Sequence, residues 1–321
     1  MRVMTISPNP ALDLSISLDS LRLAELNRAQ SIELQAAGKG VNTARVLVSL
    51  GHQVTVTGFL GADNDAAFVR AFSDMGAEDY FLRIPGATRI NTKLSEANGN
   101  VTDINAPGLE VDEHSWRRLI EHIEARLAYE RPDALMIGGS LPPGLPPSAM
   151  GSMVKRLRAY GVPLWVDTSG AALNAAVSAG ANAVKPNREE LAEWAGQPIA
   201  DEDALHQAAL SLYGQGIEET VVSDGARGVT WVSARGVWQA LPPKVAVANT
   251  VCAGDTLFAA MLHAVLSGMN PDEGLRLATA LSAEAVRHVG VGDMTASDFS
   301  DLLDDTRVRR LNDVVAGGAL A

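Results

Sequence analysis

Cysteine is almost absent from the chain, since Cys252 is the only one among 321 residues. A single cysteine excludes an internal disulfide and a metal site built from several cysteine ligands. This usage is typical of a reducing compartment, so we expect a cytoplasmic protein. No run approaches the roughly 18 apolar residues that a membrane-spanning helix needs, because the longest candidate, 257–266, is interrupted by His263. The sequence therefore predicts no membrane as a partner.

Positive charge is also scarce, because 26 Lys and Arg stand against 38 Asp and Glu and give a formal net charge of −12. Such an excess of acid argues against nucleic acids and anionic membranes as partners. An anionic substrate would need local positive charge, so the few clusters of basic residues become informative. The six histidines show no spacing typical of a metal site, and we interpret them as structural.

Apolar residues make up 47% of the chain, which is enough for a large buried core. In the second half, short apolar runs alternate with amphipathic stretches, and this alternation predicts an α/β fold with a mostly parallel sheet and helices on both faces. The expected strands are 134–138, 163–167, 182–185 and 219–223, and the expected helices are 147–160, 170–179, 188–195 and 202–214.

Two regions, 11–35 and 87–106, alternate polar and apolar residues without a helical pattern between the strands. They predict a small antiparallel sheet that projects from the main body. A small sheet is marginally stable on its own and needs cover. It would therefore act as a lid, or pair with the same sheet of a second subunit.

The most informative segment is 249–256, which is rich in small residues and runs directly into an apolar helical stretch. The unpaired N–H groups and the dipole at the start of a helix form an anion site. Asp255 lies at that point and is a candidate base for removing a proton from an alcohol. In isolation, an acid here is more often an ordinary first-turn residue favoured by the helix dipole.

A lysine flanked by glycines, Gly38-Lys39-Gly40, precedes a second predicted helix. Its spacing fits neither a P-loop nor a dinucleotide fingerprint. The segment is either a plain turn or a place where backbone N–H groups and one cation approach a polyhydroxyl ligand. In the second interpretation, the amide of Asn42 would both donate to and accept from sugar hydroxyls.

Arg89, Asn91 and Lys93 alternate along one predicted strand, so all three face the same side. Such a face is commonly solvated, but two cations and an amide in a cleft would suit a sugar phosphate. Asp13 lies in the same lid region, where it is either a turn residue or an acceptor for sugar hydroxyls.

Further polar residues follow the ends of predicted strands, where ligands of parallel sheets bind. The segment from Lys185 to Glu190 is either an ordinary helix start or a place where Asn187 and Glu190 hold water around Mg²⁺. The segment 223–228 is explained by a hairpin turn, and a nucleotide lying over that turn would also need its glycines. The residues at these strand ends are Ser140, Asp167, Lys185, Asn187, Ser223 and Asp224.

Together these segments resemble the ribokinase-like carbohydrate kinases of the phosphofructokinase B family. The resemblance extends from Met1 to about Leu303, and it is specific because separate blocks occur in the family's order. The blocks are Asn9-Pro10-Ala11-Leu12-Asp13, Gly38-Lys39-Gly40-Val41-Asn42, Thr88-Arg89-Ile90-Asn91-Thr92-Lys93, Gly139-Ser140-Leu141-Pro142-Pro143-Gly144, Asp167-Thr168-Ser169-Gly170, Lys185-Pro186-Asn187 and Ala253-Gly254-Asp255-Thr256.

The resemblance implies a three-layer sandwich with a mostly parallel central sheet and a small projecting lid sheet. It implies one domain over 1–321, with lid segments at about 11–35 and 87–106, and a homodimer formed through the lid sheets. The first two blocks are most similar to members that phosphorylate D-fructose 1-phosphate to fructose 1,6-bisphosphate with ATP and Mg²⁺. The alternatives are a kinase for tagatose 6-phosphate or fructose 6-phosphate, because the two ends of a fructofuranose ring look alike, and a non-catalytic sugar-phosphate sensor.

The resemblance also implies a role for each matching residue. Asp255 would be the catalytic base, and the amides of Ala253, Gly254 and Asp255 would form the anion hole for the transferred phosphate. Glu190 would hold the metal through water. The sugar phosphate would be bound by Asp13, Gly38, Lys39, Asn42, Arg89, Lys93 and Ser140, and ATP by Lys185, Asn187, Glu190, Ser223, Gly225 and Gly228.

Two residues depart from the family pattern without removing a chemical group. Cys252 stands where the family has glycine, and a thiol beside a helix N-terminus is expected to have a lowered pKa and to be reactive. Ala37 likewise replaces a glycine beside Gly38.

Overall fold

The computed structural model of the chain describes residues 1–312, 314–315 and 319–320. Over this part, one sheet of 11 strands runs through the molecule in the order β15-β14-β13-β12-β11-β10-β9-β1-β4-β5, with β6 paired to β4. Neighbours from β12 to β6 are parallel, and β13, β14 and β15 are added antiparallel. The strands are β1 Arg2–Ser7, β4 Gln53–Gly61, β5 Glu78–Asp79, β6 Leu82–Ile84, β9 Ala134–Gly138, β10 Leu164–Asp167, β11 Ala183–Val184, β12 Glu219–Ser223, β13 Val229–Ser233, β14 Gly236–Leu241 and β15 Arg307–Asn312.

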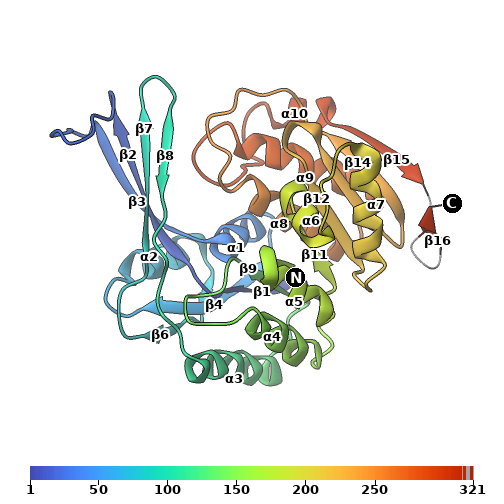
Figure 1. Ribbon diagram of the computed structural model, residues 1–321, viewed down its shortest axis with the longest axis horizontal. Helices are drawn as coiled ribbons and strands as arrows, with labels where there is room; N and C mark the ends of the chain where they lie inside the picture. The colour runs from blue at the N-terminus through green and yellow to red at the C-terminus, as the bar shows by residue number, and fades with distance from the viewer. Residues whose placement is uncertain (313, 316–318, 321) are drawn as a thin grey trace.

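Helices cover both faces of this sheet (Figure 1). Buried residues alternate between two apolar clusters along each strand, so that Ile6 belongs to one cluster and Val3 to the other. One cluster includes α3 Glu113–Tyr129, α4 Ser148–Arg158, α5 Gly170–Ser178, α6 Arg188–Ala195 and α7 Glu202–Tyr213; the other includes α1 Lys39–Ser49, α2 Ala66–Met75, α8 Ala253–Leu266, α9 Pro271–Ala285 and α10 Phe299–Asp305. The three-layer α/β fold expected from the sequence is therefore confirmed.

A second sheet projects from the body, as Figure 1 shows at the upper left, and we call it the lid sheet. Its order is β3-β2-β7-β8. The expectation of a purely antiparallel sheet is wrong, because β2 and β7 are parallel. Between these two strands the chain returns to the body to build β4 and α2, so β7 enters the lid in the same direction as β2. The bounds are β2 Ala11–Leu18, β3 Ser31–Ala37, β7 Ile90–Glu96 and β8 Val101–Ile104.

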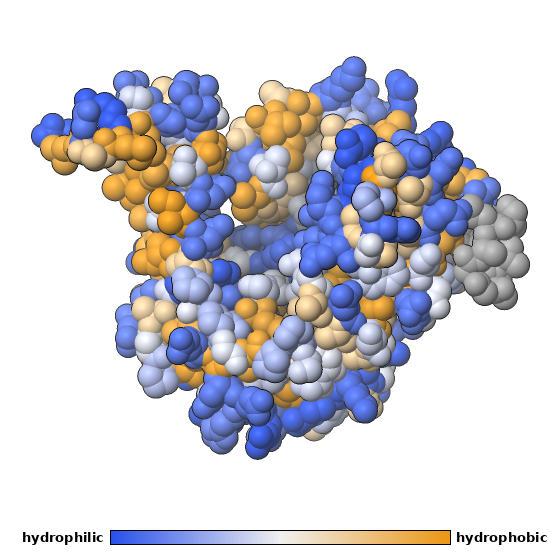
Figure 2. Space-filling view, viewed as in Figure 1, coloured by the Kyte–Doolittle hydropathy of each residue, from blue (hydrophilic) through white to orange (hydrophobic). Residues whose placement is uncertain are grey.

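The two faces of the lid sheet differ in polarity. Since side chains alternate along a strand, Asp13 shares one face with its neighbour Asn91. The opposite face is apolar and open to solvent, with Ile32 65% and Ile104 57% exposed and Leu34 beside them. Figure 2 shows hydrophobic surface over the lid sheet.

The remaining strands form a two-stranded pair near the C-terminus, β16 Val314–Val315 and β17 Ala319–Leu320. None of the helices in the described residues is long and apolar enough to cross a bilayer. Glycine-rich connections link the body strands, and one of them, η1 Gly225–Arg227, closes the predicted hairpin between β12 and β13.

Candidate active site

Asp255 is the third residue of α8 and is 6% exposed. The side-chain amide of Asn42 donates to its Oδ2 atom at 2.8 Å, and the Lys39 ammonium lies 3.9 Å from its Oδ1 atom. Both partners come from α1, which packs against α8. Two distant sequence blocks therefore meet at one carboxylate.

Asp167, at the end of β10, joins the two lysines of this region. Lys39 donates to both of its carboxylate oxygens at 3.2 and 3.1 Å, and the Lys185 ammonium lies 3.4 Å from Oδ2. Burial disfavours the charged carboxylate, but Lys185 and Lys39 outweigh it and hold the pKa of Asp167 below its ordinary value. The same contact raises the pKa of Lys39. Both groups are consequently charged at neutral pH.

The pKa of Asp255 is raised in contrast. The main cause is burial, and the Asp167 charge adds to it, whereas Lys39 and the Asn42 amide act in the opposite direction. A carboxylate with a raised pKa is a stronger base than a free aspartate and better suited to accept a proton from an alcohol.

The start of α8, beside Asp255, presents N–H groups without helical partners. The first helical hydrogen bond runs from the Thr256 N–H to the Cys252 carbonyl, so the N–H groups of the preceding residues have no partner within the helix. A Cβ atom at Gly254 would lie 3.2 Å from the Lys185 ammonium. The absence of a side chain thus lets a cation approach the helix start, where a phosphoryl group would be bound.

Cys252 precedes this helix with a φ of 70°, in the left-handed region that glycine adopts more easily. Its pKa is raised to about 12, mainly by burial and further by the charges of Asp255 and Asp13. The expectation of a reactive thiol with a lowered pKa is therefore wrong. Burial and the neighbouring carboxylates outweigh the opposing charges of Arg45 and Lys93.

A cavity of about 660 Å³ lies between the lid sheet and the body, and Figure 2 shows the hollow lined by hydrophilic residues. Asp13, Asn42 and Lys93 line it. Asn91 donates to Asp13 at 3.1 Å, and Lys93 reaches across to the Asn249 side-chain oxygen at 3.1 Å. Burial raises the pKa of Asp13 in spite of the Asn91 hydrogen bond. These residues converge as the sequence led us to expect.

Arg45 and Asn249 also line the cavity and were not among the expected site residues. Arg45 donates to the carbonyl of Ala36 at 2.6 Å and to the Asn42 side-chain oxygen at 3.3 Å. Burial lowers its pKa from the ordinary value. Its position three residues after Asn42 on one helix was the signal, because residues at that spacing share a face.

Arg89 lies outside the set of residues that line the cavity. Its guanidinium donates to the carbonyl oxygens of Asn9 at 2.9 Å, Pro10 at 3.3 Å and Ala106 at 3.0 Å. Arg89 immediately precedes β7. These bonds hold the entrance of the lid, and the charge of Arg89 acts on Asp13 in the cavity, so its contact with a sugar phosphate stays a prediction.

Ser140 lies close to the same network, because Asn9 donates to its hydroxyl at 3.2 Å. Gly38 is required by packing as well, since its Cβ would come within 3.0 Å of Pro10 Cα. The structure therefore places these two expected substrate residues at the base of the lid. Lys39 lies at the Asp255 end rather than beside Lys93.

The expected nucleotide residues gather at the ends of β11 and β12. Asn187 accepts from the Glu190 N–H at 2.7 Å and Glu190 accepts from the Asn187 N–H at 2.9 Å, which forms a capping box. Asn187 also forms a β-bridge with Ser223. Gly225 and Gly228 lie in the following turn, and the latter is fixed by packing, because its Cβ would lie 2.2 Å from the Ala240 carbonyl.

Known proteins resemble this chain in sequence and in fold. Residues 9–298 match the pfkB family of carbohydrate kinases. The 1-phosphofructokinase of Vibrio cholerae is 45% identical over 294 residues, which cover 91% of each chain. The 1-phosphofructokinase of Escherichia coli K12 is 42% identical over 291 residues, which cover 91% of this chain and 93% of that one.

The fold also resembles a solved structure, phosphofructokinase-2 from Escherichia coli in complex with substrates and products. The TM-score is 0.86 at 25% identity, over 95% of this chain and 99% of that one. Together with the identities above, this likeness confirms the family expected from the sequence. The chain belongs to the pfkB family of carbohydrate kinases.

Proposed function

We propose that this kinase phosphorylates D-fructose 1-phosphate with ATP and forms fructose 1,6-bisphosphate. Support comes from relatives of nearly full length that are named 1-phosphofructokinase. The observation that carries the proposal is the buried carboxylate of Asp255, which lies beside the helix N-terminus and is joined to the cavity by Asn42. A base next to an anion site is the arrangement that phosphoryl transfer to an alcohol requires.

The sugar would lie with its 6-hydroxyl toward Asp255 and its phosphate toward Lys93 and Arg45. Asp255 takes the hydroxyl proton while the oxygen on C6 forms a bond to the γ-phosphorus and the bond to ADP breaks. The amides at the start of α8, with Lys39 and Lys185, stabilise the charge on the transferred group. In this arrangement Lys39 stabilises the transferred phosphoryl group, and Arg45 joins Lys93 in binding the phosphate of the sugar.

ATP would be held by the residues at the ends of β11 and β12, with Asn187, Ser223, Gly225 and Gly228 around the nucleotide. Glu190 fits a role in holding hydrated Mg²⁺. The capping bond to its Oε2 atom fixes the carboxylate in place, and its charge reaches the site, where it acts on Lys39. Bound there, Mg²⁺ would neutralise phosphate charge. Since no cluster of three His, Cys, Asp or Glu in the described residues could hold a metal, its other ligands would be water and nucleotide oxygens.

We further propose a homodimer that buries the apolar face of the lid sheet, in a cytoplasmic protein. Ile32 and Ile104 are large, exposed and on the same face, and exposed apolar patches commonly mark interfaces. Substituting both with Asp should convert a dimer to a monomer in sedimentation velocity. Val69→Asp, at an exposed apolar residue of α2, is the control and should leave the dimer intact. A wild-type monomer at micromolar concentration would refute this interface.

The substrate assignment is tested by coupled ADP release with Mg·ATP. The acceptors are fructose 1-phosphate, fructose 6-phosphate, tagatose 6-phosphate, fructose and ribose. We expect the highest kcat/KM with fructose 1-phosphate. Preference for another phosphorylated sugar would replace the substrate, preference for an unphosphorylated sugar would contradict the role of Lys93 and Arg45, and turnover with none would favour a sensor.

A further inference from the structure

The loop from His288 to Asp293 forms one wall of the substrate cavity. Val289, Gly290 and Val291 line the cavity together with Cys252 and Asn249. The loop follows α9, and at its start the N–H groups of Ala248 and Asn249 donate to the Val286 carbonyl at 2.8 and 3.1 Å. A displacement of this loop would therefore change the cavity and the turn that precedes α8.

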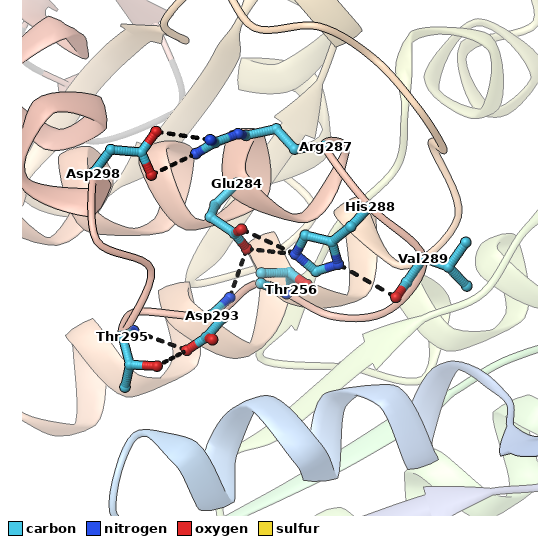
Figure 3. Close-up of polar contacts among 9 residues, drawn as sticks. Thr256, Glu284, Arg287, His288, Val289, Asp293, Thr295 and Asp298 are labelled. Atoms are coloured by element: carbon cyan, nitrogen blue, oxygen red, sulfur yellow. Dashed lines mark hydrogen bonds and ion pairs between the residues drawn. The ribbon is translucent and has the colours of Figure 1, made fainter.

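Both ends of the loop bind to one buried carboxylate, that of Glu284 on the last turn of α9 (Figure 3). Glu284 is 4% exposed. The His288 ring nitrogen Nε2 lies 2.9 and 3.0 Å from its two oxygens, and the Asp293 N–H donates to Oε2 at 2.7 Å. Hydrogen bonds to a charged group are stronger than neutral ones, so this carboxylate fixes where the loop begins and ends.

The loop is also attached to the catalytic helix. The Gly292 N–H donates to the Thr256 hydroxyl at 3.2 Å, one residue from Asp255. A Cβ at Gly292 would lie 2.4 Å from the Leu281 carbonyl, so the loop is packed tightly against α9 at that point. The contacts of Glu284 thus determine the position of a wall that touches both the cavity and α8.

We propose that Glu284 and His288 are positioning residues that hold this wall in the form that binds the sugar phosphate, and that the protonation of His288 adjusts the affinity. The inference rests on the proposed function for the identity of the ligand. If the wall is in place only part of the time, the apparent dissociation constant rises by the inverse of that fraction. Once the ligand is bound, the wall is in place, and kcat is then unaffected.

The charges around His288 give the direction of the pH effect. Its hydrogen bond to Glu284 raises its pKa above the ordinary value, burial opposes this, and the charges of Glu284 and Asp293 add to it. Arg287 is the neighbouring cation, and it pairs with Asp298. Because this pKa is raised, the contribution of the protonated His288 ring to the affinity is complete below about pH 6.5. It is lost as the pH rises through the pKa of His288 in the folded protein. Affinity should therefore fall toward alkaline pH.

The test compares the dissociation constant of fructose 1-phosphate, measured by calorimetry without nucleotide, with kcat from pH 6 to pH 9. Glu284→Gln and His288→Ala should raise the dissociation constant by about tenfold at pH 6, the scale of one charged hydrogen bond, and kcat should stay within about twofold. His288→Ala should lose most of the pH dependence. Arg287→Ala is the matched control, because this residue bonds Asp298 at 2.9 and 2.7 Å rather than the loop, and it should behave as wild type.

A second readout does not depend on the substrate. The His288 ring, followed by NMR in the free protein, should titrate above its ordinary pKa of 6.5 in wild type and return toward that value in Glu284→Gln. If fructose 1-phosphate fails to bind wild type but the ring titrates as described, the contact between Glu284 and His288 stands and the proposed substrate is wrong. A ring that titrates normally in wild type, an unchanged dissociation constant in His288→Ala, or an equal effect of Arg287→Ala would each overturn the inference.

Discussion

The two ends of the cavity are built in different ways. At the Asp255 end, the charged groups come from the body and pair with one another, and Lys185 is only 4% exposed. At the other end, Lys93 projects from the lid sheet and contacts Asn249 across the cavity. Stabilising a charge that develops during reaction requires groups that are fixed beforehand. Recognising a phosphate that is already charged requires a cation that faces the cavity, and the lid sheet provides Lys93.

Removing the base should give the largest effect. Asp255→Asn keeps the shape of the buried end and its Asn42 contact but cannot accept a proton. We expect kcat to fall by about 10²–10⁴-fold, the usual contribution of a general base, while the ATP dissociation constant changes little. Single-turnover kinetics and calorimetry measure the two quantities. A variant with most of its activity would show that another group takes the proton.

Breaking the buried pair should mainly affect stability. Asp167→Asn leaves Lys185 buried without its partner, and such losses cost about 3 kcal/mol or more. Because its pKa is lowered, Asp167 stabilises the fold above about pH 4, and this contribution is lost as the pH falls through the folded-state value. Urea unfolding from pH 3 to pH 7 should show acid sensitivity in wild type and less in the variant.

The exposed pair Arg2–Glu130 provides the control for that experiment. Exposed ion pairs contribute little to stability, so Glu130→Gln should leave the unfolding curve almost unchanged. An equal loss of unfolding free energy in both variants would mean that the ion pair between Asp167 and Lys185 contributes no more to stability than an exposed pair.

Removing the lid cation should affect recognition alone. Lys93→Met should raise the KM for fructose 1-phosphate by about tenfold, since one charged hydrogen bond is lost, and kcat should change little. Lys244→Met removes an exposed cation of another loop and should have no effect. If Lys93→Met lowered kcat as strongly as it raised KM, the separation between the two ends would not hold.

The smallest effects are expected at Cys252. Its raised pKa, about 12, predicts that iodoacetamide at pH 7.5 will modify the folded protein far more slowly than the unfolded chain. Cys252→Gly keeps the left-handed backbone conformation, which costs about 1 kcal/mol in a residue with a side chain and little in glycine, so thermal stability should stay similar or rise slightly. Rapid alkylation of the folded protein would show that the helix dipole dominates after all.

The body could be predicted from the sequence more fully than the site. The strand β9 follows from its apolar run alone, since a buried parallel strand must be apolar on both faces. The direction of β7 could not be predicted from local alternation, because it depends on where the chain re-enters the lid. The pairing of β2 with β7 links residues about 78 positions apart, and no short-range pattern records it.

The site shows the same limit. Asp255 was recognisable because a helix start, small residues and an acid coincide in one segment. Arg89, Asn91 and Lys93 look equivalent in sequence, while only Asn91 and Lys93 lie within β7, and the bonds of Arg89 to backbone carbonyls could not be read from the pattern. His288 was interpreted as structural, although its spacing of four residues from Glu284 was visible. The role proposed for His288 depends on the second contact of Glu284, with the Asp293 N–H at the other end of the loop. Only the fold shows this contact.

The most direct test of this account is the ratio of kcat/KM for fructose 1-phosphate to kcat/KM for fructose. The measurement is made in wild type and in Lys93→Met. We expect a large ratio in wild type that falls by about tenfold in the variant, with kcat for fructose 1-phosphate preserved. This result would show that the lid sheet recognises the phosphate of the substrate, while the Asp255 end transfers the phosphoryl group of ATP. A ratio near one in wild type, or a ratio that Lys93→Met leaves unchanged, would contradict it.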